Sequence, residues 1–299
     1  MGTSTATLAA ERFDTEVLGR HWIPLSMTDS DTAAVLRERL GVDFSAAGER
    51  DRETDDFLYL PVVVNYRRGD GALARETIVF ALNEDFLVTW QPAEPFAPFD
   101  AAIAKLGRDP LLTGSSHGVM YALLWALNDS SRRILSSVDD TLTGVRRDLA
   151  TATSTALRSA LTSMDDAEEI VGPVRETQRY LAGAARQLRA GIAGRRELDT
   201  RAAALVADVD SVEKYAAAEY DTLRYLQHSV RSRLDIERNR IIEILTLIAA
   251  VCLPPTLIST FANVIGMPEW EFGFLATTFV TVAAAVIPFV YVVRKGLQR

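Results

Sequence analysis

The pattern of hydrophobic and polar positions separates an amphipathic body from an apolar C-terminal end. Residues 244–265 and 272–293 form two runs of 22 positions without a charged side chain. At about 1.5 Å per residue, a helix of either run would be roughly 33 Å long, which exceeds the hydrocarbon thickness of about 30 Å. A hairpin buried in a protein core is the alternative, but such segments usually run only about 10–14 residues. The pattern therefore predicts two transmembrane helices, at residues 241–265 and 272–293.

Basic residues flank these two predicted spans on one side only. The connecting loop, residues 266–271, contains none. Because basic residues collect on the cytoplasmic side of a membrane, we expect a multi-pass protein of the inner (plasma) membrane with both termini in the cytoplasm. Residues 1–10 have neither the apolar core nor the basic start of a cleaved signal peptide. The flanking residues are Arg231, Arg233, Arg238 and Arg240 before the first span, and Arg294, Lys295 and Arg299 in the tail 294–299.

The first 138 residues combine short helical and β-rich patterns. Asp31–Leu40 predicts an amphipathic helix that Gly41 ends. Three β-rich runs follow, and the turn signal Arg68-Gly69-Asp70-Gly71 separates the first two. This spacing predicts an antiparallel hairpin extended by a third strand, within a cytoplasmic α/β domain of residues 1–138. The runs are Phe57–Tyr66, Glu76–Leu82 and Phe86–Gln91.

Helical periodicity dominates from His117 onward, where apolar residues recur at spacings of three and four. One predicted face consists of Met120, Leu123, Leu124, Leu127, Ile134, Leu135 and Val138. The pattern continues from 139 to 188, interrupted only at Gly172-Pro173, where a helix should end or kink. A weaker break at residues 191–194 permits a reversal.

The segment from 197 to 265 predicts one helix of unusual length, because it contains no glycine and no proline before Pro254. Such a helix is stable only if its apolar stripe packs on neighbours, here either the preceding helices or copies of itself. Residues 139–240 are therefore expected to form long cytoplasmic stalk helices. The stripe consists of Leu205, Val209, Val212, Tyr215, Ala216, Tyr220, Leu223 and Leu226.

Composition argues against several classes of function. The net charge is −8, and no block of five or six like charges occurs, so nucleic-acid binding has little support. The single cysteine, Cys252, cannot form a disulfide within one chain. No phosphate-binding glycine loop, paired-histidine metal helix or nucleophile elbow is present, and the three histidines are isolated in sequence. We therefore expect neither an enzyme nor a protein with a bound cofactor.

The segment from Asn239 to Ile258, NRIIEILTLIAAVCLPPTLI, resembles the pore helix of the CorA family of divalent-cation channels and transporters. Met267-Pro268-Glu269 is similar to the outer loop of that family, and Arg294-Lys295 to its basic ending. The stretch Tyr220–Arg233 more weakly resembles the family's stalk helix, and the Phe86-Leu-Val-Thr strand resembles one in its cytoplasmic domain.

This resemblance implies an α+β membrane protein that assembles as a funnel-shaped homopentamer. Each chain would supply an N-terminal α/β/α cytoplasmic domain, long stalk helices and two C-terminal transmembrane helices. The resemblance also implies passive movement of divalent cations, magnesium first, down their electrochemical gradient. The expected partners are other copies of the chain, membrane lipid and the transported cation.

The chain departs from the family at the outer end of the pore helix. CorA relatives carry Gly-Met-Asn there, and zinc-transporting relatives a Gly-x-Asn variant. Counting from Pro254 places Asn263-Val264-Ile265 on the motif, whereas counting back from Met267 places Phe261-Ala262-Asn263 there. Two alternatives therefore stay open: a non-conducting membrane scaffold or regulator with the CorA architecture, and a zinc-transporting relative.

A pore lining is predicted because residues three and four apart share one helix face. The predicted lining, which coincides with positions that the resemblance turns toward the pore, is Asn239, Ile242, Leu245, Thr246, Ala249, Leu253, Thr256 and Thr260. Apolar rings can gate by dewetting, and oxygen dipoles can bind the water shell of magnesium. The alternative is that these residues only pack helix on helix.

Other polar residues near the spans also have two interpretations. Asn263, Glu269 and Glu271 are predicted at the outer mouth, where the two carboxylates could attract cations or be merely solvated. Glu243 is expected at the inner membrane boundary, facing water, headgroups or Arg240. Pro254-Pro255 could form a hinge or a fixed kink. Regulatory metal ligands cannot be assigned from any motif.

Overall fold

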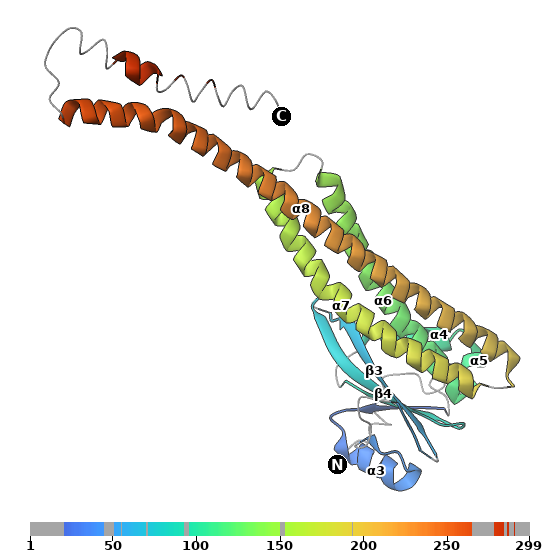
Figure 1. The fold of residues 1–299 in the computed structure, drawn as a ribbon. Coiled ribbons are helices and arrows are strands. Elements are labelled where there is room, and N and C mark those ends of the chain that lie inside the picture. The colour runs from blue at the N-terminus through green and yellow to red at the C-terminus, as the bar shows by residue number, and fades with distance from the viewer. Residues whose placement is uncertain are drawn as a thin grey trace. The chain divides into compact units, whose positions relative to one another are not determined.

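The computed structural model describes residues 21–44, 51–54, 56–69, 71–92, 96–149, 153–192, 194–264 and 278–283, together with Val286 and Val290. Of these residues, those up to 227, apart from 153–157, form one compact unit, and 153–157 with the residues from 228 onward form a second. The strands are β1 (Trp22–Ser26), β2 (Arg52–Glu53), β3 (Leu58–Arg67), β4 (Leu73–Leu82) and β5 (Leu87–Gln91). The helices are α3 (Ser30–Leu40), α4 (Ala97–Leu106), α5 (Pro110–Thr113), α6 (Ser116–Asp148), α7 (Ser154–Gly191) and α8 (Arg196–Val264) (Figure 1).

The first unit is built on a five-stranded sheet with the order β1-β5-β4-β3-β2. β3 and β4 form an antiparallel hairpin in which Arg67 pairs with Leu73, and Gly71 in its turn has a φ of 87° that favours glycine. β5 extends the hairpin as the predicted third strand, and the structure places it on the β4 side. β1 and β2 were not predicted. β1 pairs in parallel with β5, with Trp22 opposite Leu87. Because parallel strands are not joined by a tight turn, no turn signal in the sequence indicates this strand.

Side chains of β3 and β4 alternate between two hydrophobic clusters, as the period of a strand requires. Val62 and Phe80 lie in the larger cluster with residues of α4, α6, α7 and α8. Tyr59 and Val79 lie in a smaller cluster that includes Leu36 of α3. Helices therefore cover both faces of the sheet, which gives the α/β/α layering that the family resemblance implied (Figure 1).

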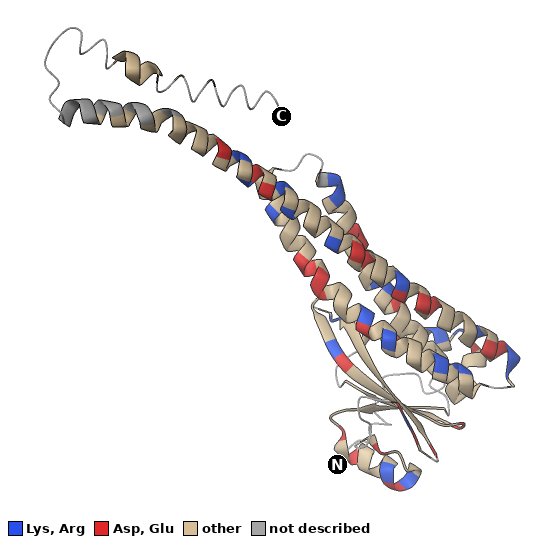
Figure 2. Cartoon of the chain, viewed as in Figure 1, with Lys and Arg blue, Asp and Glu red and all other residues tan. Residues whose placement is uncertain are grey.

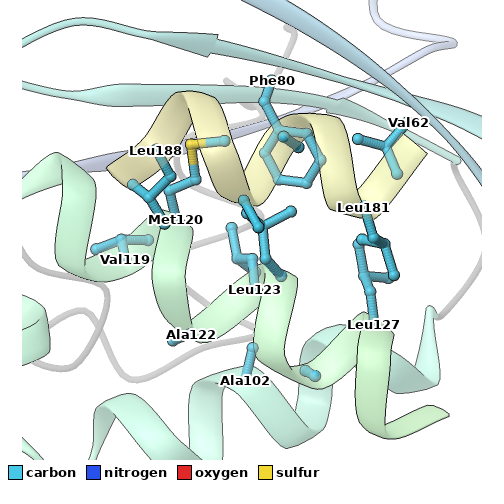
Figure 3. Close-up of a cluster of buried hydrophobic side chains, with 14 of the residues drawn as sticks. Val62, Phe80, Ala102, Val119, Met120, Ala122, Leu123, Leu127, Leu181 and Leu188 are labelled. Carbon is cyan, nitrogen blue, oxygen red and sulfur yellow. The ribbon is translucent and has the colours of Figure 1, made fainter. Parts of the chain in front are cut away.

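The larger cluster joins the sheet to the helices. Figure 3 shows Met120, Leu123 and Leu127 of α6 beside Leu181 and Leu188 of α7, under Val62 and Phe80. Every member of the face predicted on α6 is buried. α6 begins where the Ser115 hydroxyl accepts from the backbone N–H of Gly118 at 3.1 Å. Position 118 requires glycine, because an added Cβ would lie 2.4 Å from the carbonyl oxygen of Leu112.

The helices differ from the sequence analysis in where they are interrupted. Before Gly172 no interruption was expected, but α6 ends at Asp148 and α7 begins at Ser154. Thr153 is the N-cap of α7, and its carbonyl accepts the first hydrogen bond of that helix, from Leu157 N at 2.9 Å. The boundary between α6 and α7 is therefore marked by a polar capping residue and not by glycine or proline. Of the two outcomes expected at Gly172-Pro173, an end and a kink, the end is excluded, because α7 continues through Pro173.

The reversal predicted at residues 191–194 is confirmed. α7 ends at Gly191, Gly194 has a φ of 100°, and α8 begins at Arg196. Ion pairs between Arg189 and Asp199 (3.4 Å) and between Arg186 and Asp210 (3.7 Å) join the two helices.

The single long helix predicted over 197–265 is also confirmed, as α8. Most of its predicted stripe is buried, from Leu205 to Leu226, whereas Tyr215 and Tyr220 are only partly buried. Glu219 is buried in place of Tyr220.

Candidate functional site

The C-terminal part of α8, from Asn239 onward, carries all eight predicted pore-lining residues, and each of them is exposed in the single chain. Ile242 is 51% exposed, Leu245 60% and Leu253 57%. Large apolar side chains on the other faces are equally uncovered, including Ile241, Ile244, Ile248 and Leu257. A helix that is apolar on all sides is normally covered by other protein or by lipid. In a single copy of the chain, nothing covers this segment of α8.

The charge pattern of α8 changes at Glu243. On its N-terminal side basic and acidic residues are interspersed along the helix, and on its C-terminal side no described residue of α8 is charged (Figure 2). Arg238, Arg240 and Glu243 are all exposed at this boundary. Pro254 and Pro255 lie within α8, which continues through both.

The three threonine hydroxyls of the predicted lining all donate their protons to backbone carbonyls of α8. Thr246 Oγ1 donates to the carbonyl of Ile242 at 2.8 Å, Thr256 Oγ1 to that of Leu253 at 2.8 Å, and Thr260 Oγ1 to that of Thr256 at 2.7 Å. A hydroxyl has one proton and two lone pairs. Because the helix takes up the proton, each oxygen retains acceptor capacity. Such oxygens are complementary to the outward-pointing hydrogens of a hydrated cation.

The predicted outer mouth lies largely outside the described residues. Asn263 belongs to the last turn of α8, but its side chain is not described, and Glu269 and Glu271 lie outside the described residues altogether. The second predicted span, 272–293, is described only at 278–283 and at two single positions. Within the described part of the chain, no helix has both the length and the apolar character needed to cross a membrane. The two spans stay predictions.

The first unit contains polar groups that the sequence did not reveal as buried. Asn128 Nδ2 of α6 donates to Asp208 of α8 at 2.8 Å, and the same carboxylate pairs with Arg132. Gln227 Nε2 donates to Asp165 (3.1 Å) and Glu168 (2.9 Å) of α7. These bonds join the three long helices in their shared core.

Glu219 is the most unusual of the buried groups. Its side chain is 8% exposed, and Oε2 has no hydrogen-bond partner among the described residues. Burial raises the pKa of this carboxyl, Asp139 raises it further, and Arg146 opposes the shift. The spacing from Ala216 to Leu223 could have indicated an inward Glu219, but hydrophobicity alone favoured Tyr220.

The histidines are separated in the structure as they are in sequence. His21 Nδ1 contacts the carbonyl of Asp85, and His228 is exposed. His117 is buried, with its Nδ1 3.2 Å from the Ser116 hydroxyl, and burial lowers its pKa, assisted by Arg195 and opposed by Glu84. Over the described residues, no three His, Cys, Asp or Glu side chains are placed to hold a metal ion.

Comparison with known proteins identifies the family. The family described as "CorA-like Mg2+ transporter protein" matches residues 19–295. The chain belongs to this family. The resemblance inferred from the pore-helix segment is thereby confirmed, and members of the CorA family are divalent-cation transporters rather than enzymes.

Individual CorA relatives match nearly the whole chain. The magnesium transport protein CorA of Escherichia coli K12 is 24% identical, with 92% of this chain and 91% of that protein covered. The complete structure of the CorA magnesium transporter from Methanocaldococcus jannaschii matches with a TM-score of 0.67 at 18% identity, over 92% of this chain and 90% of that one. The ZntB cytoplasmic domain from Vibrio parahaemolyticus matches with a TM-score of 0.58 at 14% identity, over 73% and 88%. At these identities the structural matches show a shared CorA-like fold, an N-terminal α/β domain with long helices.

Proposed function

We propose that the chain is a channel of the inner (plasma) membrane that passes magnesium ions passively, as a homopentamer with both termini of each chain in the cytoplasm. The observation that carries this proposal is the exposed C-terminal part of α8, which is apolar on all sides and carries threonine oxygens as acceptors along one stripe. Family membership supports the transport of a divalent cation, and the CorA relatives named for magnesium support the choice of ion.

Assembly follows from the number of predicted spans. Two helices from one chain cannot enclose an aqueous path, so several copies must surround an axis. In the proposed arrangement, residues 241–265 form the inner ring and residues 272–293 the outer ring. The loop 266–271 lies outside the cell, and the tail 294–299 returns to the cytoplasm. Residues 1–138 form the cytoplasmic α/β domain, and residues 139–240 the stalk.

The path then has three zones along the predicted lining. Asn239 presents an amide at the cytoplasmic end, and Ile242, Leu245 and Leu253 supply apolar rings that can close by dewetting. Thr256 and Thr260 supply acceptor oxygens toward the outer end. Because magnesium loses its water shell reluctantly, hydroxyl oxygens that accept from that shell suit it better than a tight cage of carboxylates. Asn263, Glu269 and Glu271 complete the outer mouth.

Flux through purified protein tests the proposal. Liposomes containing the protein and a magnesium-sensitive dye should show magnesium entry down an imposed gradient without nucleotide. Protein-free liposomes report the leak, and a crosslinking or mass measurement in lipid reports the number of copies. Absence of flux for magnesium, zinc, cobalt and nickel at every internal ion level would rule out the channel function and favour the non-conducting scaffold.

Zinc is the second candidate cargo, because neither alignment of the outer end of the pore helix restores Gly-Met-Asn and the fold also matches a ZntB domain. A zinc transporter of this kind would show proton-coupled zinc uptake with little magnesium passage. Parallel measurements with zinc- and magnesium-sensitive dyes, with and without a proton gradient, separate the two.

A further inference from the structure

The charged residues just before the first predicted span are sorted by sign around α8. At about 100° per residue, Asp235 and Glu243 each lie about 40° from Asn239, one on either side of it. Arg238 and Arg240 each lie about 100° from Asn239, again one on either side. The two carboxylates therefore share the side of Asn239, and the two arginines point to opposite flanks of the helix.

Both arginines also lie at the level where lipid headgroups are expected. The run without charges begins at Ile244, and Arg240 lies about 6 Å and Arg238 about 9 Å before it along the helix axis. The headgroup layer on one side of a bilayer is roughly 5–8 Å thick. A long arginine side chain can extend its guanidinium into this layer from its border, so both groups can reach lipid phosphates.

The two guanidinium groups have no ionic partner within the chain. Arg238 and Arg240 are exposed, and neither makes an ion pair with any described residue, although Asp235 and Glu237 lie three positions before them. A guanidinium carries five N–H donors in a planar fork, and this fork can bind two oxygens of one phosphate. Each flank of α8 therefore presents a group suited to phosphate.

We propose that Arg238 and Arg240 form a docking surface for anionic lipid of the cytoplasmic leaflet, in which each guanidinium binds a headgroup phosphate. This inference rests on the proposed function, because it requires the first predicted span to lie in the membrane and Asn239 to face the ion path. The carboxylates of Asp235 and Glu243 then lie on the path side, where negative charge attracts cations. The arginines point sideways, and basic pockets beside membrane helices on the cytoplasmic side are suited to anionic headgroups.

Other charges of this segment modify the docking surface. Glu237 is exposed and lies about 160° from Asn239, between the two flanks on the far side of the helix. Its carboxylate repels a lipid phosphate and should weaken docking. Arg231 and Arg233 lie roughly 10 Å further from the membrane, which is about one Debye length at physiological salt, so screening reduces their contribution.

The test uses the full-length protein with equal amounts of phosphatidylglycerol and phosphatidylcholine in detergent, and native mass spectrometry counts the bound lipids of each kind. We expect the unmodified protein to retain more phosphatidylglycerol. Arg238→Gln with Arg240→Gln should lower the ratio of the two lipids by about fivefold for each arginine removed, whereas replacing both by lysine keeps the charge and should retain most of the preference. Lys214→Gln with Arg224→Gln is the matched control, because it removes two exposed positive charges of α8 that lie at least about 30 Å before Ile244.

Further outcomes test the sign and the source of the phosphate. Glu237→Gln should raise the ratio of phosphatidylglycerol to phosphatidylcholine, because it removes a repelling carboxylate. Inorganic phosphate at millimolar concentration should displace little phosphatidylglycerol; complete displacement would show a site for free phosphate and overturn the docking surface.

The proposal can fail without the channel. If both lipids bind equally, or if the control variant loses as much preference as the arginine variant, the docking surface is overturned, and magnesium flux through the unmodified protein shows that the channel stands. A protein that binds neither lipid and passes no magnesium would instead contradict the proposed function.

Discussion

Asn65 of β3 donates twice to the hydroxyl oxygen of Thr177 on α7, from its backbone N and from Nδ2, each at 3.0 Å. Nδ2 also reaches the carbonyl of Pro173 at 2.8 Å. β2 pairs only with the first residues of β3, at Leu58 and Tyr59, so the rest of that edge needs other partners. α7 supplies them at Asn65 and thereby covers this point of an edge that could otherwise pair with another chain.

Removing either partner of this contact should destabilise the first unit. Asn65→Ala and Thr177→Val are each expected to lower the free energy of unfolding by about 1–3 kcal/mol, because each leaves a buried polar group unpaired. Urea unfolding followed by circular dichroism measures the change. The double variant should cost less than the sum of the two; full additivity would mean that the two residues do not act together.

Glu219 should make stability depend on pH. Burial first, and Asp139 second, raise the pKa of its carboxyl in the folded chain. The folded state therefore binds this proton more readily than the unfolded state, so this contribution to stability is present at low pH and is lost as the pH rises through the folded pKa. Glu219→Gln should raise the free energy of unfolding at pH 8 by about 1 kcal/mol and flatten its dependence on pH.

Thermal unfolding of Glu219→Gln at several pH values between 4 and 8 measures this effect. Glu237→Gln, an exposed carboxylate of the same helix, is the control and should leave the profile unchanged. A loss of stability in Glu219→Gln at pH 8 would contradict the role assigned to burial.

His117 should give stability a pH dependence opposite to that of Glu219. Burial, followed by Arg195, lowers the pKa of its imidazole below the ordinary value of 6.5. The unfolded chain therefore binds this proton more readily, and stability should fall as the pH drops below about 6.5. His117→Gln should reduce this slope between pH 6.5 and 5, by up to about 1.4 kcal/mol per pH unit. An unchanged slope would show that other groups produce the acid sensitivity.

Thr256 should matter more for permeation than Ala283. Thr256 lies on the exposed stripe of α8, and Ala283 is partly buried in a helical segment that we assign to the outer ring. Thr256→Lys should reduce magnesium flux by at least about tenfold, because a fixed positive charge in the path repels the ion. Ala283→Lys tests whether any charge in this region has the same effect, and equal losses would remove Thr256 from the predicted lining.

The sequence predicted those elements whose signals are local. β3 and β4 could be recognised because a turn with Gly71 joins two β-rich runs, and α8 because no breaker interrupts it before Pro254. β1 could not, since its pairing with β5 depends on residues far along the chain. The end of α6 at Asp148 was missed because a threonine cap marks the start of α7 instead of glycine or proline.

The candidate site was predictable to a different extent. Spacing and family resemblance were enough to select one stripe of α8, and the structure adds the direction of the threonine hydroxyls. Which residues face an axis depends on other copies of the chain, so neither one sequence nor one chain decides it. Glu219 was overlooked because hydrophobicity favours tyrosine over glutamate at an inward position, although helix geometry turned the carboxyl inward.

The hydroxyl protons of Thr246, Thr256 and Thr260 are all engaged by carbonyls of their own helix. In the proposed channel, chloride or phosphate at these three residues would meet oxygen lone pairs and no free hydroxyl proton from which to accept a hydrogen bond. The proposed lining would therefore discriminate against anions without any charged side chain, through the direction of three hydrogen bonds within α8.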